Sequence, residues 1–294
     1  MAMRERVCHL AASEGSRVAA GAFEGLVEVW DVSTPARLGS FRTVLDFGGR
    51  RLCLDRLGTR CFAGAYRQAC VVAYDVADGH VIWSRSDIGR VQKMSRSTDS
   101  MLFIGVEDGP CQIVDSADGK TLEKLHGVVQ VFESPAGTAR LLDRKTPVVE
   151  LRGGRSFEVQ RSSFAILDVA FGPSTLCLSE AAGPTRCLDL DDGREVWRYQ
   201  PPQGEHVLFL TYCSSVDAFL GVSREYKRTS AYTLVHLGPG ENLCHLAALG
   251  RPVVAAFCAS GEAVLLDDGR LLTASTGELI RNVPLVDGAD QVDA

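Results

Sequence analysis

The sequence predicts an all-β fold, a seven-bladed β-propeller built from four-stranded antiparallel blades. Three observations lead to this prediction. A turn pattern returns about every 40 residues along nearly the whole chain, the segments between turns are short and rich in β-branched and aromatic residues, and no segment has a helical hydrophobic period. A small sheet cannot cover both of its own faces, so repeated sheets of this kind stack against their neighbours as propeller blades.

The repeated turn starts with an acidic or polar residue, and glycine follows four positions later in its clearest copies. An Asp side chain can accept hydrogen bonds from the backbone N–H groups just after it, and glycine supplies a positive φ without steric cost. The clearest copies are Asp75 to Gly79, Asp115 to Gly119 and Asp189 to Gly193. Other copies, several of them degenerate, begin at Asp31, Leu151, His236 and Thr273. One anchor therefore falls in each predicted blade.

The anchors divide the chain into blades and the blades into strands. We predict one domain over residues 1–286 and a polar tail over 287–294, with blades at 4–42, 43–86, 87–126, 127–161, 162–201, 202–248 and 249–286. The strands predicted for the first three blades are 6–11, 17–22, 26–30 and 37–41; 51–54, 60–64, 70–74 and 81–85; 91–94, 101–106, 111–114 and 121–125. Those predicted for the next two are 128–132, 139–142, 148–151 and 156–159; 165–171, 175–178, 185–188 and 194–199. The last two have 207–212, 218–222, 231–235 and 242–247; 253–258, 263–266, 271–274 and 278–283.

Two stretches resemble known propeller repeats. Residues Gly25 to Asp31 resemble the third strand of a WD repeat, with its terminal Trp-Asp. Residues Ala73 to Trp83 resemble the docking motif A-x-D-x-x-T-G-x-x-x-W of quinoproteins, with Asp78 where Thr is usual, and the stretch ending at Trp197 fits the later part of that motif. The resemblance implies a WD-repeat-like or PQQ-type (quinoprotein-like) propeller in which the outer-strand tryptophans pack between blades. Both families are functionally diverse, so the resemblance carries no function.

Composition excludes several classes of partner and compartment. The net charge is −6 and the isoelectric point is about 5.6, which argues against binding to nucleic acid or to an anionic membrane. Residues Met1 to Leu10 lack the apolar run of a signal peptide, and no apolar run near either end is long enough to span a bilayer. None of the ten cysteines forms a C-x-x-C pair. We therefore expect a cytoplasmic protein with reduced thiols, for which a monomer is plausible.

The sequence contains no linear catalytic or cofactor motif. It has no G-x-S-x-G, H-E-x-x-H, G-x-x-x-x-G-K-[ST] or G-x-G-x-x-G pattern. Adjacent residues on a strand point to opposite faces, so Cys8 with His9, or Cys244 with His245, cannot easily share a metal ion. The pairs Asp191-Asp192 and Asp267-Asp268 lie in or next to turns, where solvated acids are expected. We accordingly predict no catalytic residue, no metal and no cofactor.

The loops are where a partner is expected to bind. In a propeller, the loops joining second to third strands and those joining successive blades emerge on one face, and rigid sheets hold them. The loop Ser223 to Thr229 of the sixth blade is the longest and most basic, and Tyr between arginines has the composition of an interface anchor. The predicted partner-binding residues are Arg224, Tyr226, Lys227, Arg228, Arg67, Arg144 and Tyr199. The residues expected to have structural roles in the repeat are Trp30, Asp31, Asp75, Gly79, Trp83, Asp115, Gly119, Asp189, Gly193 and Trp197.

Three function classes remain open from the sequence. The first is a non-catalytic protein–protein interaction module, a scaffold, regulator or neutraliser of a partner protein, which binds through the loop face. The alternative is a propeller hydrolase or lyase whose catalytic residues come from separate blades around the central channel, so that no linear motif is required. Sensing of a small ligand or sugar is a third possibility.

Overall fold

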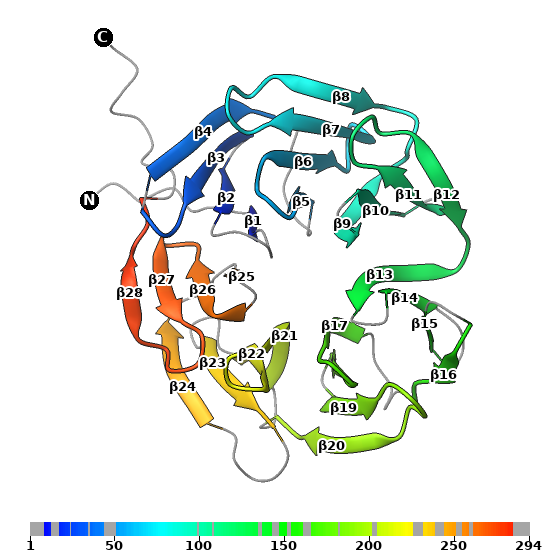
Figure 1. Ribbon diagram of the computed structural model, residues 1–294, viewed down its shortest axis with the longest axis vertical. Coiled ribbons are helices and arrows are strands. Elements are labelled where there is room, and N and C mark those ends of the chain that lie inside the picture. Colours follow the sequence, from blue (N-terminus) through cyan, green and yellow to red (C-terminus); the bar gives the residue numbers. More distant parts are fainter. Residues whose placement is uncertain are drawn as a thin grey trace. The chain divides into compact units, whose positions relative to one another are not determined.

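The seven predicted blades are present as seven four-stranded antiparallel sheets, which confirms the predicted fold class (Figure 1). The structure, a computed structural model, describes residues 9–12, 18–23, 25–34, 36–43, 51–98, 100–107, 109–134, 137–142, 147–151, 154–160, 166–181, 183–201, 205–225, 232–238, 244–250, 255–258 and 261–284. The numbered elements in these ranges are all strands, and within each sheet the strands pair in chain order.

The chain divides into two compact units. The first comprises Met1–His126, Leu265–Leu271 and Leu279–Ala294, and the second comprises Gly127–Val264 and Leu272–Glu278. The first three blades belong to the first unit. Their strands are β1 (His9–Ala12), β2 (Val18–Phe23), β3 (Leu26–Asp31) and β4 (Ala36–Arg42); β5 (Leu52–Leu54), β6 (Arg60–Ala65), β7 (Cys70–Asp75) and β8 (Val81–Arg85); β9 (Val91–Thr98), β10 (Met101–Val106), β11 (Cys111–Asp115) and β12 (Thr121–Leu125).

Blades four to six belong to the second unit. Their strands are β13 (Val128–Ser134), β14 (Gly137–Leu142), β15 (Val148–Leu151) and β16 (Ser156–Glu158); β17 (Ile166–Phe171), β18 (Thr175–Glu180), β19 (Thr185–Asp189) and β20 (Glu195–Tyr199); β21 (Glu205–Cys213), β22 (Ala218–Glu225), β23 (Tyr232–Leu237) and β24 (Cys244–Gly250). The seventh sheet consists of β25 (Ala255–Cys258), β26 (Ala263–Leu266), β27 (Arg270–Thr273) and β28 (Leu279–Asn282).

The strand sequences follow from their positions in the blade. The middle strands β6 and β7 of the second blade are buried along almost their whole length, because a neighbouring blade covers each face. They are correspondingly almost continuous in small and β-branched apolar residues. The outer strand β8 is exposed at Val81 and buried at Trp83, since one of its faces meets solvent. The hydrophobic cores of the first unit accordingly lie between blades one and two and between blades two and three.

The repeated turn has the predicted geometry at Asp75. Its Oδ1 accepts the N–H of Ala77 at 2.8 Å, and its carbonyl accepts the N–H of Gly79 at 2.9 Å. Gly79 has φ of +71°, a backbone region that favours glycine. The same pair of bonds occurs in the turns that begin at Asp115 and Asp189.

The anchors at Asp31 and His236 depart from this geometry. In the first blade, which has Pro35 where the glycine would stand, the Asp31 carboxylate accepts hydrogen bonds from Ser33, mainly from its hydroxyl, and these lower the pKa of Asp31. The turn expected to start at His236 was placed too early, because β23 continues through this residue to Leu237. The second residue of that anchor, Gly240, lies outside the described residues.

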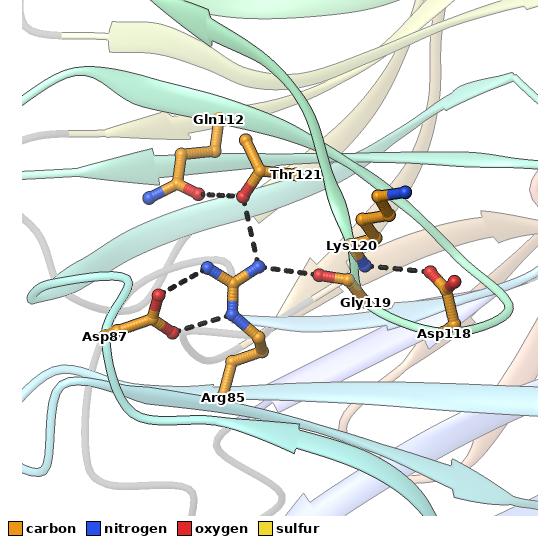
Figure 2. Close-up of polar contacts among 7 residues, drawn as sticks. All are labelled: Arg85, Asp87, Gln112, Asp118, Gly119, Lys120 and Thr121. Carbon is orange, nitrogen blue, oxygen red and sulfur yellow. Dashed lines mark hydrogen bonds and ion pairs between the residues drawn. The ribbon is translucent and has the colours of Figure 1, made fainter.

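Neighbouring blades of the first unit are joined at these turns. The indole of Trp83, on β8, packs against Gly119 in the turn of the third blade and donates its Nε1–H to the carbonyl of Ser116 at 3.1 Å. Arg85 adds a polar clamp, shown in Figure 2: Nη1 donates to the Gly119 carbonyl at 2.7 Å, and Nε and Nη2 pair with both oxygens of Asp87. The guanidinium group lowers the pKa of Asp87. The quinoprotein-like stretch thus lies at a blade-to-blade contact.

Candidate protein-interaction site

In the first unit, an aromatic ring lies at the turn between the second and third strands of blade two. The turn runs over residues 66–69, between β6 and β7, and it carries Tyr66 and Arg67 at its start. Ala69 has φ of 50°, an uncommon value for a non-glycine residue, so the turn is tight. Tyr66 is half-buried and Arg67 is exposed. The neighbouring sheets therefore hold the ring while the residue after it reaches solvent.

Four segments of blades two and three meet at this ring. The guanidinium carbon of Arg51, just before β5, lies 5.0 Å from the ring centroid, and that of Arg90, just before β9, lies 5.7 Å away. The Tyr66 hydroxyl donates a hydrogen bond to Oε2 of Glu107, which directly follows β10. Arg90 also pairs with Oε2 of Glu107 at 3.4 Å. We call Arg51, Tyr66, Arg90 and Glu107 the Tyr66 cluster.

Burial differs across the Tyr66 cluster. Arg51 is only 8% exposed, whereas the side chains of Arg90 and Glu107 are 56% and 37% exposed. The buried guanidinium group lies against an aromatic face, where a cation–π interaction compensates part of its lost hydration. The outer members keep contact with water. The cluster therefore has a fixed inner part and an accessible outer edge.

Hydrogen bonding shifts the acid–base equilibria of this cluster. The bond from the Tyr66 hydroxyl, and then the contacts with Arg90, lower the pKa of Glu107. The same bond raises the pKa of Tyr66, because the neutral phenol is its donor form. At neutral pH the arrangement is a phenol donor on a carboxylate beside two guanidinium groups.

The second unit carries a different polar arrangement at the corresponding strand ends. Arg224 is the seventh residue of β22, with His206 of β21 and Tyr232 of β23 as its Cα partners across the sheet. Its guanidinium carbon lies 5.6 Å from the centroid of the Tyr232 ring. Burial, and then the charge of Arg224, lowers the pKa of His206. The sixth-blade loop was predicted to begin at Ser223, but β22 extends to Glu225, because Arg224 packs on the strand beside it.

Tyr199 also belongs to a strand, as the last residue of β20. Its hydroxyl is buried, and burial together with the charge of Glu205 raises the pKa of Tyr199 to about 12. Glu205 in turn accepts a hydrogen bond from the Ser223 hydroxyl at 2.9 Å. The ring packs against the apolar core between blades five and six. The side chain as a whole keeps partial exposure, so its role in binding a partner stays a prediction.

A buried ion pair lies at the same end of blade five. Glu180 of β18 and Arg186 of β19 pair through Oε1 and Nη2, and both residues are at least nine-tenths buried. Desolvation of two charges offsets much of their attraction, so such a pair stabilises weakly but is costly to break on one side. We assign it to the packing of the sheet.

Comparison with solved structures identifies the fold. No family model matches the chain, and no curated protein sequence matches it. The crystal structure of RRP9 WD40 repeats superposes with a TM-score of 0.67 over 90% of this chain and 88% of that chain, at 12% sequence identity. The chain has the fold of a WD40-repeat propeller. At this identity the likeness shows the fold and nothing further.

The WD40-like position in this propeller is Trp30-Asp31. Both residues end β3 in the first blade, with the indole of Trp30 buried and the carboxylate of Asp31 bonded to Ser33. In blade five, Trp197 packs edge-on against Phe219 of β22, with ring centroids 6.2 Å apart. The quinoprotein-like part of the resemblance stays a prediction. In the described part of the propeller, no helix is long and apolar enough to cross a membrane.

A cluster of potential metal ligands occurs in the turn of blade two. One ligand atom each from Asp75, Asp78 and His80 lies within 4.8 Å of the others. The Asp78 carboxylate already accepts the His80 N–H at 3.0 Å and contacts its Nδ1 at 2.6 Å, and both contacts lower the pKa of Asp78. The equivalent turn of blade three has the same backbone bond, from Lys120 to Asp118. Lys120 stands at the position of His80 in that turn, so the bond that both turns share joins the Asp side chain to the backbone. We therefore assign Asp78 and Asp118 to the hydrogen bonding of their turns.

The predicted partner-binding residues fall in three places. Arg67 lies exposed beside the Tyr66 cluster, whereas Arg224 and Tyr199 lie on strands of the second unit. Tyr226, Lys227, Arg228 and Arg144 lie outside the described residues, so their role stays a prediction.

The prediction selected Arg67 but no member of the Tyr66 cluster. One signal could have found its two arginines: Arg51 and Arg90 both directly precede the first strand of successive blades.

Proposed function

We propose that this chain is a non-catalytic protein-interaction module whose partner binds at the turn between β6 and β7, with Tyr66 as the anchor. One observation carries the proposal. Tyr66 is held by side chains from three other chain segments, Arg51, Arg90 and Glu107, although its turn reaches solvent. A ring fixed in this way has already lost most of its rotational freedom.

This preorganisation matters for affinity. Ordering a side chain on binding costs about 0.5–1.5 kcal/mol, and a ring that is already ordered avoids that cost. Tyr and Arg are also the residue types most enriched among those that dominate binding energy. Tyr66 and the exposed Arg67, adjacent in one tight turn, combine both types. The turn therefore suits a rigid contact with another protein.

Acid–base properties support binding rather than catalysis. In the described part of the chain, the carboxyl groups with a resolved pKa shift are Asp31, Asp78, Asp87 and Glu107, and each is shifted downward. Hydrolases and lyases commonly need a carboxyl group whose pKa is raised toward neutrality. The alternative of a hydrolase or lyase thus gains no support from these residues.

The sixth-blade loop is a second proposed contact, resting on its sequence. Arg224 packs at its base, and Tyr226, Lys227 and Arg228 follow in the chain. A scaffold, regulator or neutraliser could use both loops. The cytoplasmic location and the absence of contact with nucleic acid or membrane belong to the same proposal, on the grounds of acidity and of cysteine usage.

Site-specific photo-crosslinking in the native host tests this proposal. A photoreactive phenylalanine analogue replaces Arg67, and a matched variant carries it at Arg56. Arg56 is an exposed arginine in the turn between β5 and β6, at the other end of the same blade. We expect a discrete protein adduct from position 67 and none from position 56. Adducts from position 56 alone, or equal adducts from both, would contradict the proposed site.

A further inference from the structure

Two cysteines face each other across neighbouring strands of blade five. Cys177 of β18 and Cys187 of β19 are Cα partners in an antiparallel register without irregularity, so their side chains lie on the same face of the sheet. Neither cysteine is in a disulfide, and both are at most 1% exposed. Both belong to the apolar core between blades five and six. The pair is therefore a buried, facing set of two thiols.

The backbone register places this pair close together. The N–H of Leu190 donates to the carbonyl of Ser174, directly opposite, at 3.0 Å, so these two residues form a hydrogen-bonded pair of the ladder. Hydrogen-bonded and non-hydrogen-bonded pairs alternate along antiparallel strands, so Cys177 and Cys187 form a non-hydrogen-bonded pair, in which the Cα atoms are about 4.5 Å apart. A disulfide accommodates Cα separations of about 4.4–6.8 Å. The two sulfur atoms can thus be joined without a shift of either strand.

Burial keeps both thiols protonated while the core is closed. Burial, and then the charge of Cys187, raises the pKa of Cys177. Burial also raises the pKa of Cys187 to about 11. Because the thiolate is the reactive form, the pair reacts only during a local opening of the core between blades five and six.

We propose that Cys177 and Cys187 form a redox latch, a reversible disulfide that is made when this core opens in the presence of a peroxide and that closes the β18–β19 hairpin covalently. The inference goes beyond the proposed interaction site and does not depend on it. In a reducing compartment, disulfides of this kind are transient and report oxidation.

The reaction balances with hydrogen peroxide as the oxidant. One thiolate attacks a peroxide oxygen and becomes a sulfenic acid, while the other oxygen leaves as hydroxide and takes up the proton of that thiol as water. The second thiol attacks the sulfenic sulfur, which forms the S–S bond and releases a second water. The two thiols lose two electrons and the peroxide gains them. A small thiol reductant reverses the reaction by thiol–disulfide exchange.

Mapping of disulfides in peroxide-treated protein tests the latch. Trypsin cleaves after Arg186, so Cys177 and Cys187 fall in the separate peptides 162–186 and 187–194, which remain together only if a disulfide links them. Thiols that have not reacted are first alkylated with iodoacetamide. Cys61 is the matched control, because it is also fully buried but has Leu54 and Tyr74 as its Cα partners. The same treatment is applied to Cys177→Ala and to wild type unfolded in urea.

We expect the folded wild type to accumulate the linked peptides while Cys61 remains alkylated, and the unfolded chain to link Cys177 to several cysteines. The linked protein should unfold at about 1 M higher urea than the reduced protein, because the cross-link restricts the unfolded chain. Dithiothreitol should reverse the shift, and peroxide-treated Cys177→Ala should not show it. Both thiols remaining alkylated in folded protein, under peroxide that oxidises the unfolded chain, would overturn the proposal. Preferential linkage of Cys177 to any cysteine other than Cys187 in folded protein, or a linked protein with an unchanged urea midpoint, would overturn it equally.

Discussion

The indole of Trp83 lies directly against Gly119 of the next blade. A Cβ atom built on Gly119 would lie 2.7 Å from the ring carbons Cδ2 and Cε3. Gly119 also has φ of +72°. The same relation recurs between Phe41 and Gly79 and, in the second unit, between Phe157 and Gly193, where the added Cβ would again come within 2.7 Å of the aromatic side chain. An aromatic residue on the outer part of one blade thus fixes the turn of the next.

Gly119→Ala should destabilise the protein more than its backbone conformation alone predicts. Gly127 provides the control, because it has φ of +68° and no atom within 4 Å of its added Cβ. We expect Gly127→Ala to lower the free energy of unfolding by about 1 kcal/mol because of the positive φ. Gly119→Ala should lower it by about 2–4 kcal/mol, because overpacking adds its own cost. Urea unfolding measures both values. Equal losses would show that the contact with Trp83 is not tight.

Trp83→Phe should separate the hydrogen bond of the indole from its packing. The substitution keeps an aromatic ring but removes the Nε1–H that donates to the Ser116 carbonyl. We expect a loss of about 1–3 kcal/mol in the free energy of unfolding. Val81→Ala, on the same strand at a side chain that is 53% exposed, should change it by about 0.5 kcal/mol or less. A larger effect at Val81 than at Trp83 would contradict the assignment.

Glu180→Gln should be more harmful than removal of the whole buried ion pair. The single substitution leaves the guanidinium group of Arg186 buried without its counter-charge, which we expect to cost about 3–5 kcal/mol. The double variant Glu180→Leu/Arg186→Met should recover most of that loss, because it buries no charge. Unfolding in urea checks the order of the two. Additive losses would mean that the pair does not act as a unit.

Glu107 should make stability depend on acid pH. Its pKa in the folded protein is below the ordinary value of 4.5, so its stabilising contribution is present above pH 4.5 and is lost as the pH falls through the folded pKa. Glu107→Gln should therefore unfold at lower urea than the wild type at pH 7, and the difference should vanish in acid. Tyr66→Phe should weaken the same pH dependence, because the hydrogen bond from the Tyr66 hydroxyl is the largest cause of the lowered pKa of Glu107. A difference that persists at low pH would contradict this account.

The repeat made the fold predictable because the same short pattern of turn, aromatic residue and buried strand occurs several times along the chain. Asp75 with Gly79 defines the turn, Trp83 supplies the aromatic contact, and Val71 to Tyr74 form a buried strand, all from adjacent residues. The candidate site has no such local signature. Its members come from segments far apart in sequence, as Tyr66 and Glu107 do, and only the pairing of blades two and three brings them together. The same limit explains Tyr199, whose hydroxyl is buried beside the next blade.

The most direct test of the central claim measures the affinity of the partner captured by crosslinking at position 67, with Tyr66→Ala compared against Leu57→Ala. Leu57 is 65% exposed in the turn between β5 and β6, at the other end of blade two, so it controls for loss of an accessible apolar side chain. We predict that Tyr66→Ala raises the dissociation constant by about 30-fold, corresponding to about 2 kcal/mol for an anchor residue. Leu57→Ala should leave it unchanged. Unaltered affinity in Tyr66→Ala, or an equal loss in Leu57→Ala, would contradict the claim that Tyr66 anchors the partner.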